Sequence, residues 1–132
     1  MTDKTGGAPS VDAQTFAATM GQAAWLMTLS KSHRDLPMST LETLVSPAIL
    51  LRQFKLYSKG KQPVAFLVWA SVSDAVKARL ESGDKTLALA DWRSGPNIVI
   101  VECISPFNPP ETFEQKFLAA AQAAQNNSNA KD

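Results

Sequence analysis

The sequence predicts a single α/β domain in which helices cover a mixed, mostly antiparallel sheet. The period of the apolar residues is the first observation behind this prediction: it is helical in the first third of the chain and changes to two at Phe54. The second is size, because 132 residues, 45% of them hydrophobic, can build one core and are too few for two ordinary domains. The short Gly-containing turn between the first two strands, together with helices that precede and follow the sheet, favours an antiparallel sheet over a doubly wound βαβ repeat.

Polar segments at both ends set the expected limits of the domain. Residues 1–9 are polar and Gly-rich, and we expect them to form a flexible N-terminal lead. Residues 126–132 are also polar, and we expect a flexible C-terminal tail there. The folded domain is therefore predicted to cover residues 10–125.

The first half of this domain is predicted to be helical. Residues 11–29 have apolar side chains at helical spacing, and the pattern stops at the polar loop 30–35. A shorter helix is predicted for about 39–51, which Pro47 kinks or divides because proline has no N–H to donate. The stripe of the first helix consists of Phe16, Met20, Ala23 and Met27, and its candidate N-caps are Ser10 and Asp12.

Strands follow from Phe54 onward. The turn-like residues 58–61 separate a first alternating segment from the apolar run 64–71, so the two are predicted to form an antiparallel hairpin. The apolar run is nearly continuous, as expected of a central strand covered on both faces.

The last third of the chain predicts a helix, a strand and a helix. Residues 73–82 read as a helix that begins at a serine cap and ends at Gly83. Residues 97–105 are predicted to be the last strand, because prolines stand on both sides of an apolar run. A final helix is predicted to open at Pro109 and to continue through an Ala-rich stretch.

Composition excludes several classes of function. Thirteen Lys and Arg against twelve Asp and Glu give a net charge of +1, without the basic excess typical of a duplex-DNA binder. Apolar runs are far shorter than the roughly 20 residues of a membrane span, and the N-terminus does not resemble an export signal. A single cysteine, Cys103, suits a reducing compartment. We therefore expect a soluble, cytoplasmic protein.

Glu102 is unusual because it lies inside an apolar strand. Residues two apart share a face of a strand, so Ile98, Ile100, Glu102 and Ile104 are predicted to face one way and Val99, Val101 and Cys103 the other. Since both faces are apolar, we expect the carboxylate to be buried, and then paired, protonated or placed at a cleft. The alternative is a glutamate at the end of the strand that caps a turn near Pro106.

His33 is the second candidate, because it is the only histidine and imidazole exchanges protons near neutral pH. The alternative is an exposed loop residue, and spacing alone does not show that it meets Glu102. Cys103 is expected in the core, where apolar neighbours raise a thiol pKa. One histidine and one cysteine predict no metal site.

The order of several short segments resembles one family, the toxin-activating lysine-acyltransferases, which fatty-acylate RTX protoxins such as haemolysin. The resemblance covers about residues 20–107. It is carried by Gly21–Leu26, Ser32–Arg34 with Pro37 and Ser39, Pro47–Ile49, Pro63–Phe66 with Trp69 and Ala70, Asp91 and Trp92 with Ser94 and Gly95, and Glu102 with Ile104, Pro106 and Phe107.

This resemblance implies a fold similar to the GNAT acyltransferases and a catalytic pair formed by His33 and Glu102. It implies acyl carrier protein as acyl donor, an RTX-like protein as substrate, no permanently bound cofactor, and a homodimer. The family usually has aspartate where Glu102 stands, and some members have a polar residue in place of Leu44. Typical members also continue further than the 25 residues that follow Phe107 here, which leaves a different protein substrate open.

In the mechanism that the resemblance suggests, His33 is the general base for the lysine amine and Glu102 orients the imidazole. The alternative is that His33 transiently carries the acyl group. Acyl carrier protein is acidic, so a basic surface should receive it, and the candidates are Lys31, Arg34, Lys59, Lys61 and Arg93.

Two other functions stay open from the sequence. One is a non-catalytic, chaperone-like binding module on an acyltransferase scaffold. The other is a protein acyltransferase that uses acyl-CoA, although the chain lacks the usual GNAT pyrophosphate-binding loop, which favours a carrier-bound donor.

Overall fold

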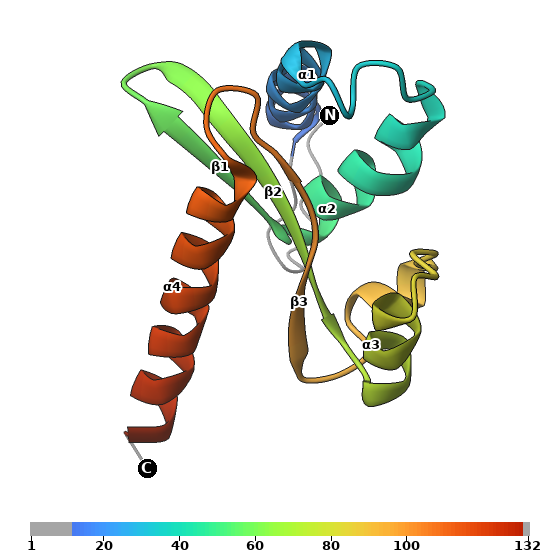
Figure 1. Ribbon diagram of the computed structural model, residues 1–132, viewed down its shortest axis with the longest axis vertical. Coiled ribbons are helices and arrows are strands. Elements are labelled where there is room, and N and C mark those ends of the chain that lie inside the picture. Colours follow the sequence, from blue (N-terminus) through green and yellow to red (C-terminus); the bar gives the residue numbers. More distant parts are fainter. Residues whose placement is uncertain (1–11, 131–132) are drawn as a thin grey trace.

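A three-stranded antiparallel sheet forms the middle of the computed structural model, which describes residues 12–130 (Figure 1). The strands are β1 (Phe54–Lys59), β2 (Gln62–Val72) and β3 (Asn97–Ile104), in the spatial order β1-β2-β3. Three α-helices cover one face, namely α1 (Ala13–Leu29), α2 (Ser46–Leu51) and α3 (Asp74–Glu81), and α4 (Pro110–Ala130) covers the other. The predicted α/β domain with an antiparallel sheet is confirmed, whereas the likeness to the GNAT fold stays a prediction.

The central strand β2 is buried on both faces, as its continuous apolar run predicts. Phe66 and Val68 face the larger cluster, which the side chains of α1, α2 and α3 complete. Ala65 and Leu67 face a smaller cluster that contains Phe113 of α4. Two clusters on opposite sides of one thin sheet thus hold the domain together.

Helix α1 begins and packs as the sequence predicts. The backbone N–H of Thr15 donates to Asp12 Oδ1 at 2.7 Å, so Asp12 is the N-cap in the described part of the chain. Of the predicted stripe, Ala23 and Met27 are buried, and Phe16 and Met20 pack against the larger cluster.

The predicted second helix is divided at its proline. A π-helical turn, η1 (Leu41–Val45), precedes α2, and Pro47 lies in the first turn of α2. Proline cannot donate the hydrogen bond that would continue the preceding turn, and it is tolerated at the start of a helix. At the other end of α2, Arg52 takes a left-handed conformation with φ +59°.

The hairpin and the helix after it form where predicted. Gly60, with φ +63°, makes the turn between β1 and β2. The Ser73 hydroxyl caps α3 by accepting from the N–H of Val76 at 3.2 Å. A short 3₁₀ turn, η2 (Leu89–Trp92), was not predicted, and an ion pair of 2.9 Å between Arg79 Nη2 and Asp91 Oδ2 connects it to α3.

Gly95 allows the chain to pass close to the start of α3 before it enters β3. A Cβ atom at this position would lie 2.5 Å from the Ser73 Cα and 2.7 Å from its backbone nitrogen. The Gly95 N–H donates to the carbonyl of Ser71 at 3.2 Å. No side chain fits here, so glycine is required for packing at this position.

Helix α4 is longer than predicted, because it continues to Ala130 and includes most of the segment 126–132 that was expected to be a tail. The last two turns contain no glycine or proline that would end a helix. The lead predicted at 1–9 lies outside the described residues. Between residues 12 and 130, none of the helices combines the length and apolarity that a membrane crossing requires.

Candidate active site

His33 lies in the turn that follows α1, and its side chain is only 7% exposed. The Ser30 carbonyl, at the C-cap of α1, accepts from the backbone N–H of His33 at 3.0 Å and from that of Arg34 at 2.9 Å. This tight turn directs the imidazole into the protein although its neighbours in the loop are exposed. The alternative of an exposed surface histidine is therefore wrong.

Two serine hydroxyls hold the inner edge of the imidazole. Ser30 Oγ lies 2.6 Å and Ser32 Oγ 3.1 Å from His33 Nδ1. Sequence reasoning did not single out either serine as a site residue. The signal was present, since hydroxyl residues stand three and one positions before the only histidine.

A β-bulge in β3 decides which way Glu102 points. Glu102 pairs with Val68, but the next residue of β2, Trp69, pairs with Ile100, so Val101 has no partner across the ladder. A bulge of this kind re-aims side chains in a strand. Val101 and Ile104 consequently pack with the larger cluster, and Ile100 packs with the smaller one.

The prediction that Ile98, Ile100, Glu102 and Ile104 share one face is wrong for this reason. Simple alternation fails at the bulge, and the two isoleucines at its N-terminal side face α4. The structure places Glu102 on the α1 side, toward His33.

The side chains of His33 and Glu102 meet across the gap between the loop and the strand. His33 Nε2 lies 3.5 Å from Glu102 Oε2. The glutamate side chain is 42% exposed, so the expectation of a buried carboxylate is wrong, whereas that of a paired group is confirmed. The Cys103 backbone N–H also donates to Glu102 Oε1 at 3.2 Å, which fixes the carboxylate at the strand.

The surroundings keep Glu102 ionised. Hydrogen bonding with the His33 imidazole lowers the pKa of Glu102, partial burial opposes this, and the charge of His33, the Cys103 N–H and Lys85 lower the pKa further. A carboxylate accepts hydrogen bonds only, so the unliganded pair is satisfied when Nε2 carries a proton and Nδ1 accepts from a serine hydroxyl. A contact of 3.5 Å is long for a hydrogen bond, so a further polar group that approaches from the side can interact with both atoms.

The basic residues proposed to bind a carrier do not form one patch. Lys31 and Arg34 are exposed on either side of His33 in the loop. Lys61 lies at the tip of the β1–β2 hairpin, whereas Arg93 forms a β-bridge with Ser71 near the other end of β2. At the rise per residue of an extended strand, Ser71 is roughly 30 Å along β2 from the hairpin tip. The side chain of Arg93 also donates to Gln53 Oε1 at 2.8 Å and to the carbonyl of Leu51, so it connects η2 to the end of α2.

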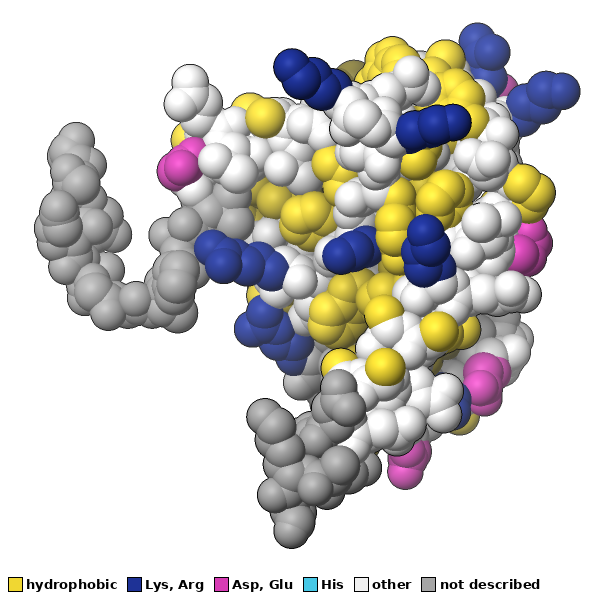
Figure 2. Space-filling model, turned by 90° about the vertical axis from the view of Figure 1, so that its left-hand side faces the viewer, with side chains coloured by type: hydrophobic (Ala, Val, Ile, Leu, Met, Phe, Trp, Pro, Cys, Tyr) yellow, Lys and Arg dark blue, Asp and Glu magenta, His cyan; other side chains and the backbone are white. Residues whose placement is uncertain are grey.

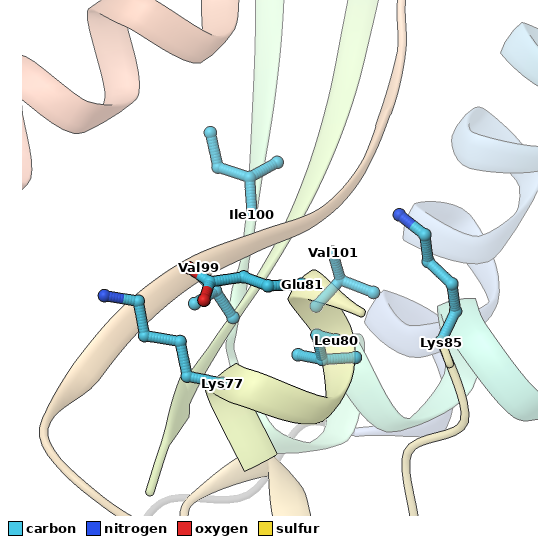
Figure 3. Close-up of a pocket in the computed structure, with 7 residues that line it drawn as sticks. All are labelled: Lys77, Leu80, Glu81, Lys85, Val99, Ile100 and Val101. Atoms are coloured by element: carbon cyan, nitrogen blue, oxygen red, sulfur yellow. The ribbon is translucent and has the colours of Figure 1, made fainter. Parts of the chain in front are cut away.

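A cavity of about 250 Å³ adjoins His33 on the side of α1. A second cavity, of about 340 Å³, lies between α3 and β3 next to the bulge, with Lys77 and Lys85 toward its opposite ends (Figure 3). Its other lining residues are Leu80, Glu81 and residues 99–101. A third, of about 470 Å³, lies between α4 and the sheet, on the face where Figure 2 shows apolar side chains among lysines and arginines.

Cys103 and Leu44 lie away from the gap between His33 and Glu102. Cys103 is buried, and burial raises the pKa of its thiol to about 12, helped by nearby glutamates. It packs with the α4 cluster, as predicted. Leu44 packs against the larger cluster. Within the described residues, no group of three His, Cys, Asp or Glu side chains is placed to hold a metal ion.

The fold and this gap define a class: a small α/β domain that presents a buried imidazole to a half-exposed carboxylate. Comparison with known proteins makes the assignment specific. Residues 12–129 match the RTX toxin acyltransferase family, and the chain belongs to that family.

Several relatives are named lysine acyltransferases. The chain is 33% identical over 88 residues to the protein-lysine myristoyltransferase RtxC of Kingella kingae, an alignment that covers 67% of the chain and 53% of the relative. It is 35% identical to the RTX-II toxin-activating lysine-acyltransferase ApxIIC of Actinobacillus pleuropneumoniae, over 67% of the chain and 55% of the relative. It is 36% identical over 97 residues to the lysine-acyltransferase RtxC of Vibrio cholerae, over 70% and 63%. The chain thus spans little more than half the length of these relatives.

Proposed function

We propose that the protein transfers a fatty acyl group from acyl carrier protein to the ε-amine of a lysine in a protein substrate, with His33 as general base and Glu102 as its partner. The observation that carries this proposal is the 3.5 Å approach of His33 Nε2 to Glu102 Oε2 at the edge of a cavity. Family membership supports the reaction class. By analogy with the relatives' names, an RTX-like protein is the proposed substrate.

The substrate lysine enters as an ammonium ion, because its pKa is near 10.4 in water. Glu102 is ionised at neutral pH and half exposed, so it attracts the ammonium group toward Nε2. A nitrogen can lie about 2.9 Å from both Oε2 and Nε2 when it approaches from one side of these two atoms, which are 3.5 Å apart. With the ring proton on Nδ1, one ammonium proton passes to Nε2, and the neutral amine attacks the thioester carbonyl. The C–S bond then breaks, the imidazolium returns its proton to the departing carrier thiolate, and the second amine proton is released to solvent as the amide forms.

Ser30 and Ser32 give the ring its orientation in this proposal, a role that the sequence-based mechanism assigned to Glu102. When Nε2 accepts a proton from lysine, Nδ1 must be the protonated nitrogen, and the Ser30 hydroxyl 2.6 Å away can accept from it. Because Nδ1 is enclosed by hydroxyls, Nε2 is the ring nitrogen left to react. It cannot carry the acyl group and accept the amine proton at once, which favours direct transfer over an acyl-histidine intermediate.

Lys31 and Arg34 are the proposed contacts for the acidic acyl carrier protein, since they are exposed beside His33. The donor itself is tested by comparing acyl carrier protein with CoA as the carrier of the same acyl chain. Charge reversal at Lys31 and Arg34 should raise the KM for the carrier-bound donor at least tenfold at low salt, whereas Lys61→Glu should change it little. The proposed homodimer is tested separately by light scattering.

The decisive experiment measures acylation of lysine by mass spectrometry with purified donor and a co-purified RTX-type protein. His33→Ala should abolish transfer, and Glu102→Gln should reduce kcat at least a hundredfold because the amide neither attracts the ammonium nor stabilises imidazolium. The matched control is Glu81→Gln, an exposed carboxylate on α3 that should transfer at the wild-type rate. Full activity of His33→Ala would refute the assignment. If the wild type binds the partner protein without acylating it, the binding-module reading replaces the enzyme.

A further inference from the structure

The cavity beside His33 is apolar, although it opens next to a reactive imidazole. Its walls come from one face of α1, from the loop after it, and from the start of η1. The lining residues are Ala24, Met27, Thr28, His33, Arg34, Leu36, Pro37, Met38 and Leu41. Most of these residues are hydrophobic, so the cavity suits an apolar ligand rather than a charged one.

The mouth of the cavity exposes apolar side chains to solvent. Met38 is 82% exposed and Leu36 is 42% exposed. Leaving such groups in water forgoes their hydrophobic stabilisation, and adjacent exposed apolar residues commonly mark a binding site. Methionine also adapts its shape to ligands of irregular form. The exposed side chains at the mouth thus fit a ligand that enters the cavity and covers them.

The charged residues around the cavity disfavour the substrate lysine as its ligand. Arg34 lies at the rim of the cavity and would repel an ammonium group, and the attracting carboxylate of Glu102 does not line it. Two larger cavities, described above, fit an acyl chain less well. The one between α3 and β3 is lined by Lys77, Glu81 and Lys85, and the one under α4 lies on the opposite face of the sheet from His33.

We infer that the cavity beside His33 holds the acyl chain of the thioester donor and places its carbonyl next to the imidazole. This inference rests on the proposed acyl transfer and adds the position and the length of the chain. A cavity of about 150 Å³ accommodates benzene, which is about 25 Å³ per carbon. The 250 Å³ beside His33 therefore holds about ten carbons. Medium-length chains should be preferred over the longer myristoyl chain for which some relatives are named.

Ala24 is the residue through which this length preference can be changed. It lies on α1 at the wall of the cavity, and leucine there adds three carbons, or about 75 Å³ on the same scale. Ala24→Leu should shift the preferred chain about three carbons shorter. It should weaken binding of a ten-carbon chain about 50-fold, from the hydrophobic contribution of three methylene groups. Ala18→Leu, at an exposed position of the same helix, is the matched control.

Binding can be measured without catalysis. The probe is an S-decyl pantetheine thioether, which has no carbonyl to transfer, and the protein carries ¹³C-labelled methionine methyl groups. Met27 and Met38 line the cavity, whereas Met20 packs against the larger core cluster and serves as an internal reference. The methyl signals of Met27 and Met38 should move on titration while that of Met20 stays. A lysine-containing peptide should leave the signals of Met27 and Met38 in place.

The second measurement is the rate of transfer from acyl carrier protein loaded with chains of six to sixteen carbons. A maximum near ten carbons that moves to about seven in Ala24→Leu, and stays in Ala18→Leu, supports the inference. Transfer with an unchanged length profile and unmoved Met27 and Met38 signals would overturn it while leaving the proposed function standing. Probe binding at Met27 and Met38 without transfer from any donor would instead remove the proposed function and keep the chain site. If Ala24→Leu fails to fold, the test uses Met38→Ala at the exposed mouth of the cavity. This variant should bind the probe at least fivefold more weakly. Unchanged binding would contradict the inference.

Discussion

Ser30→Ala tests whether the serine hydroxyls position the imidazole of His33, the proposed general base. Ser30 Oγ lies 2.6 Å from His33 Nδ1, and both side chains are 7% exposed, so water does not readily replace the lost hydroxyl. Leaving a buried polar atom short of its partner costs about 1–3 kcal/mol. If the whole cost is expressed as misorientation of the ring in the transition state, kcat falls about 5- to 150-fold.

The assay is single-turnover acyl transfer, with KM measured in parallel and folding checked by thermal unfolding. A positioning residue affects kcat while KM stays within about twofold, because Ser30 contacts the ring at Nδ1 and does not line the cavity proposed for the donor. Ser32→Ala is the control. The distance from Ser32 Oγ to His33 Nδ1 is longer, at 3.1 Å, and Ser32 is exposed, so this substitution should lower kcat less than fivefold. Wild-type kcat in Ser30→Ala, in a protein that is folded, would refute the reasoning.

Three further predictions concern stability and reactivity. Gly95→Ala should lower the free energy of unfolding by about 2 kcal/mol or more in chemical denaturation, because its Cβ would overlap the backbone of Ser73, and equal stability would contradict the close approach. Native Cys103, with a thiol pKa near 12, should react with a thiol reagent at pH 8 only after unfolding, and rapid labelling of the folded protein would disprove its burial. Because the pKa of Glu102 is lower in the folded protein than in the unfolded chain, its stabilising contribution is complete above about pH 5 and disappears as pH falls through and below about 4.5. The stability difference between wild type and Glu102→Gln should narrow over that range, and a pH-independent difference would argue against the ion pair.

Local patterns were sufficient for most of the secondary structure. The stripe of α1, the cap at Asp12 and the division at Pro47 depend on residues that are close in sequence, and each has the predicted effect. The apolar run of β2 predicted a strand covered on both faces for the same reason. Such features follow from hydrogen-bonding capacity and side-chain spacing within one element, so they are readable without the fold.

The family resemblance found in the sequence is confirmed by the match over residues 12–129. It selected His33 and Glu102 from a chain with twelve acidic residues, although spacing alone left their proximity open. Their catalytic roles stay a proposal. The approach of the two side chains is what the structure adds to that selection.

Tertiary structure alone decided the direction in which the site residues point. The sequence by itself determined most of the elements, the single domain and the two candidate residues. It did not determine that His33 turns inward onto Ser30, that an unpaired Val101 re-aims Glu102, or that Arg93 is used to connect η2 to α2. Each of these outcomes depends on how one element is aligned in space with another element. A one-residue shift across a ladder exchanges the faces of a strand, and no local pattern records which residue is left unpaired.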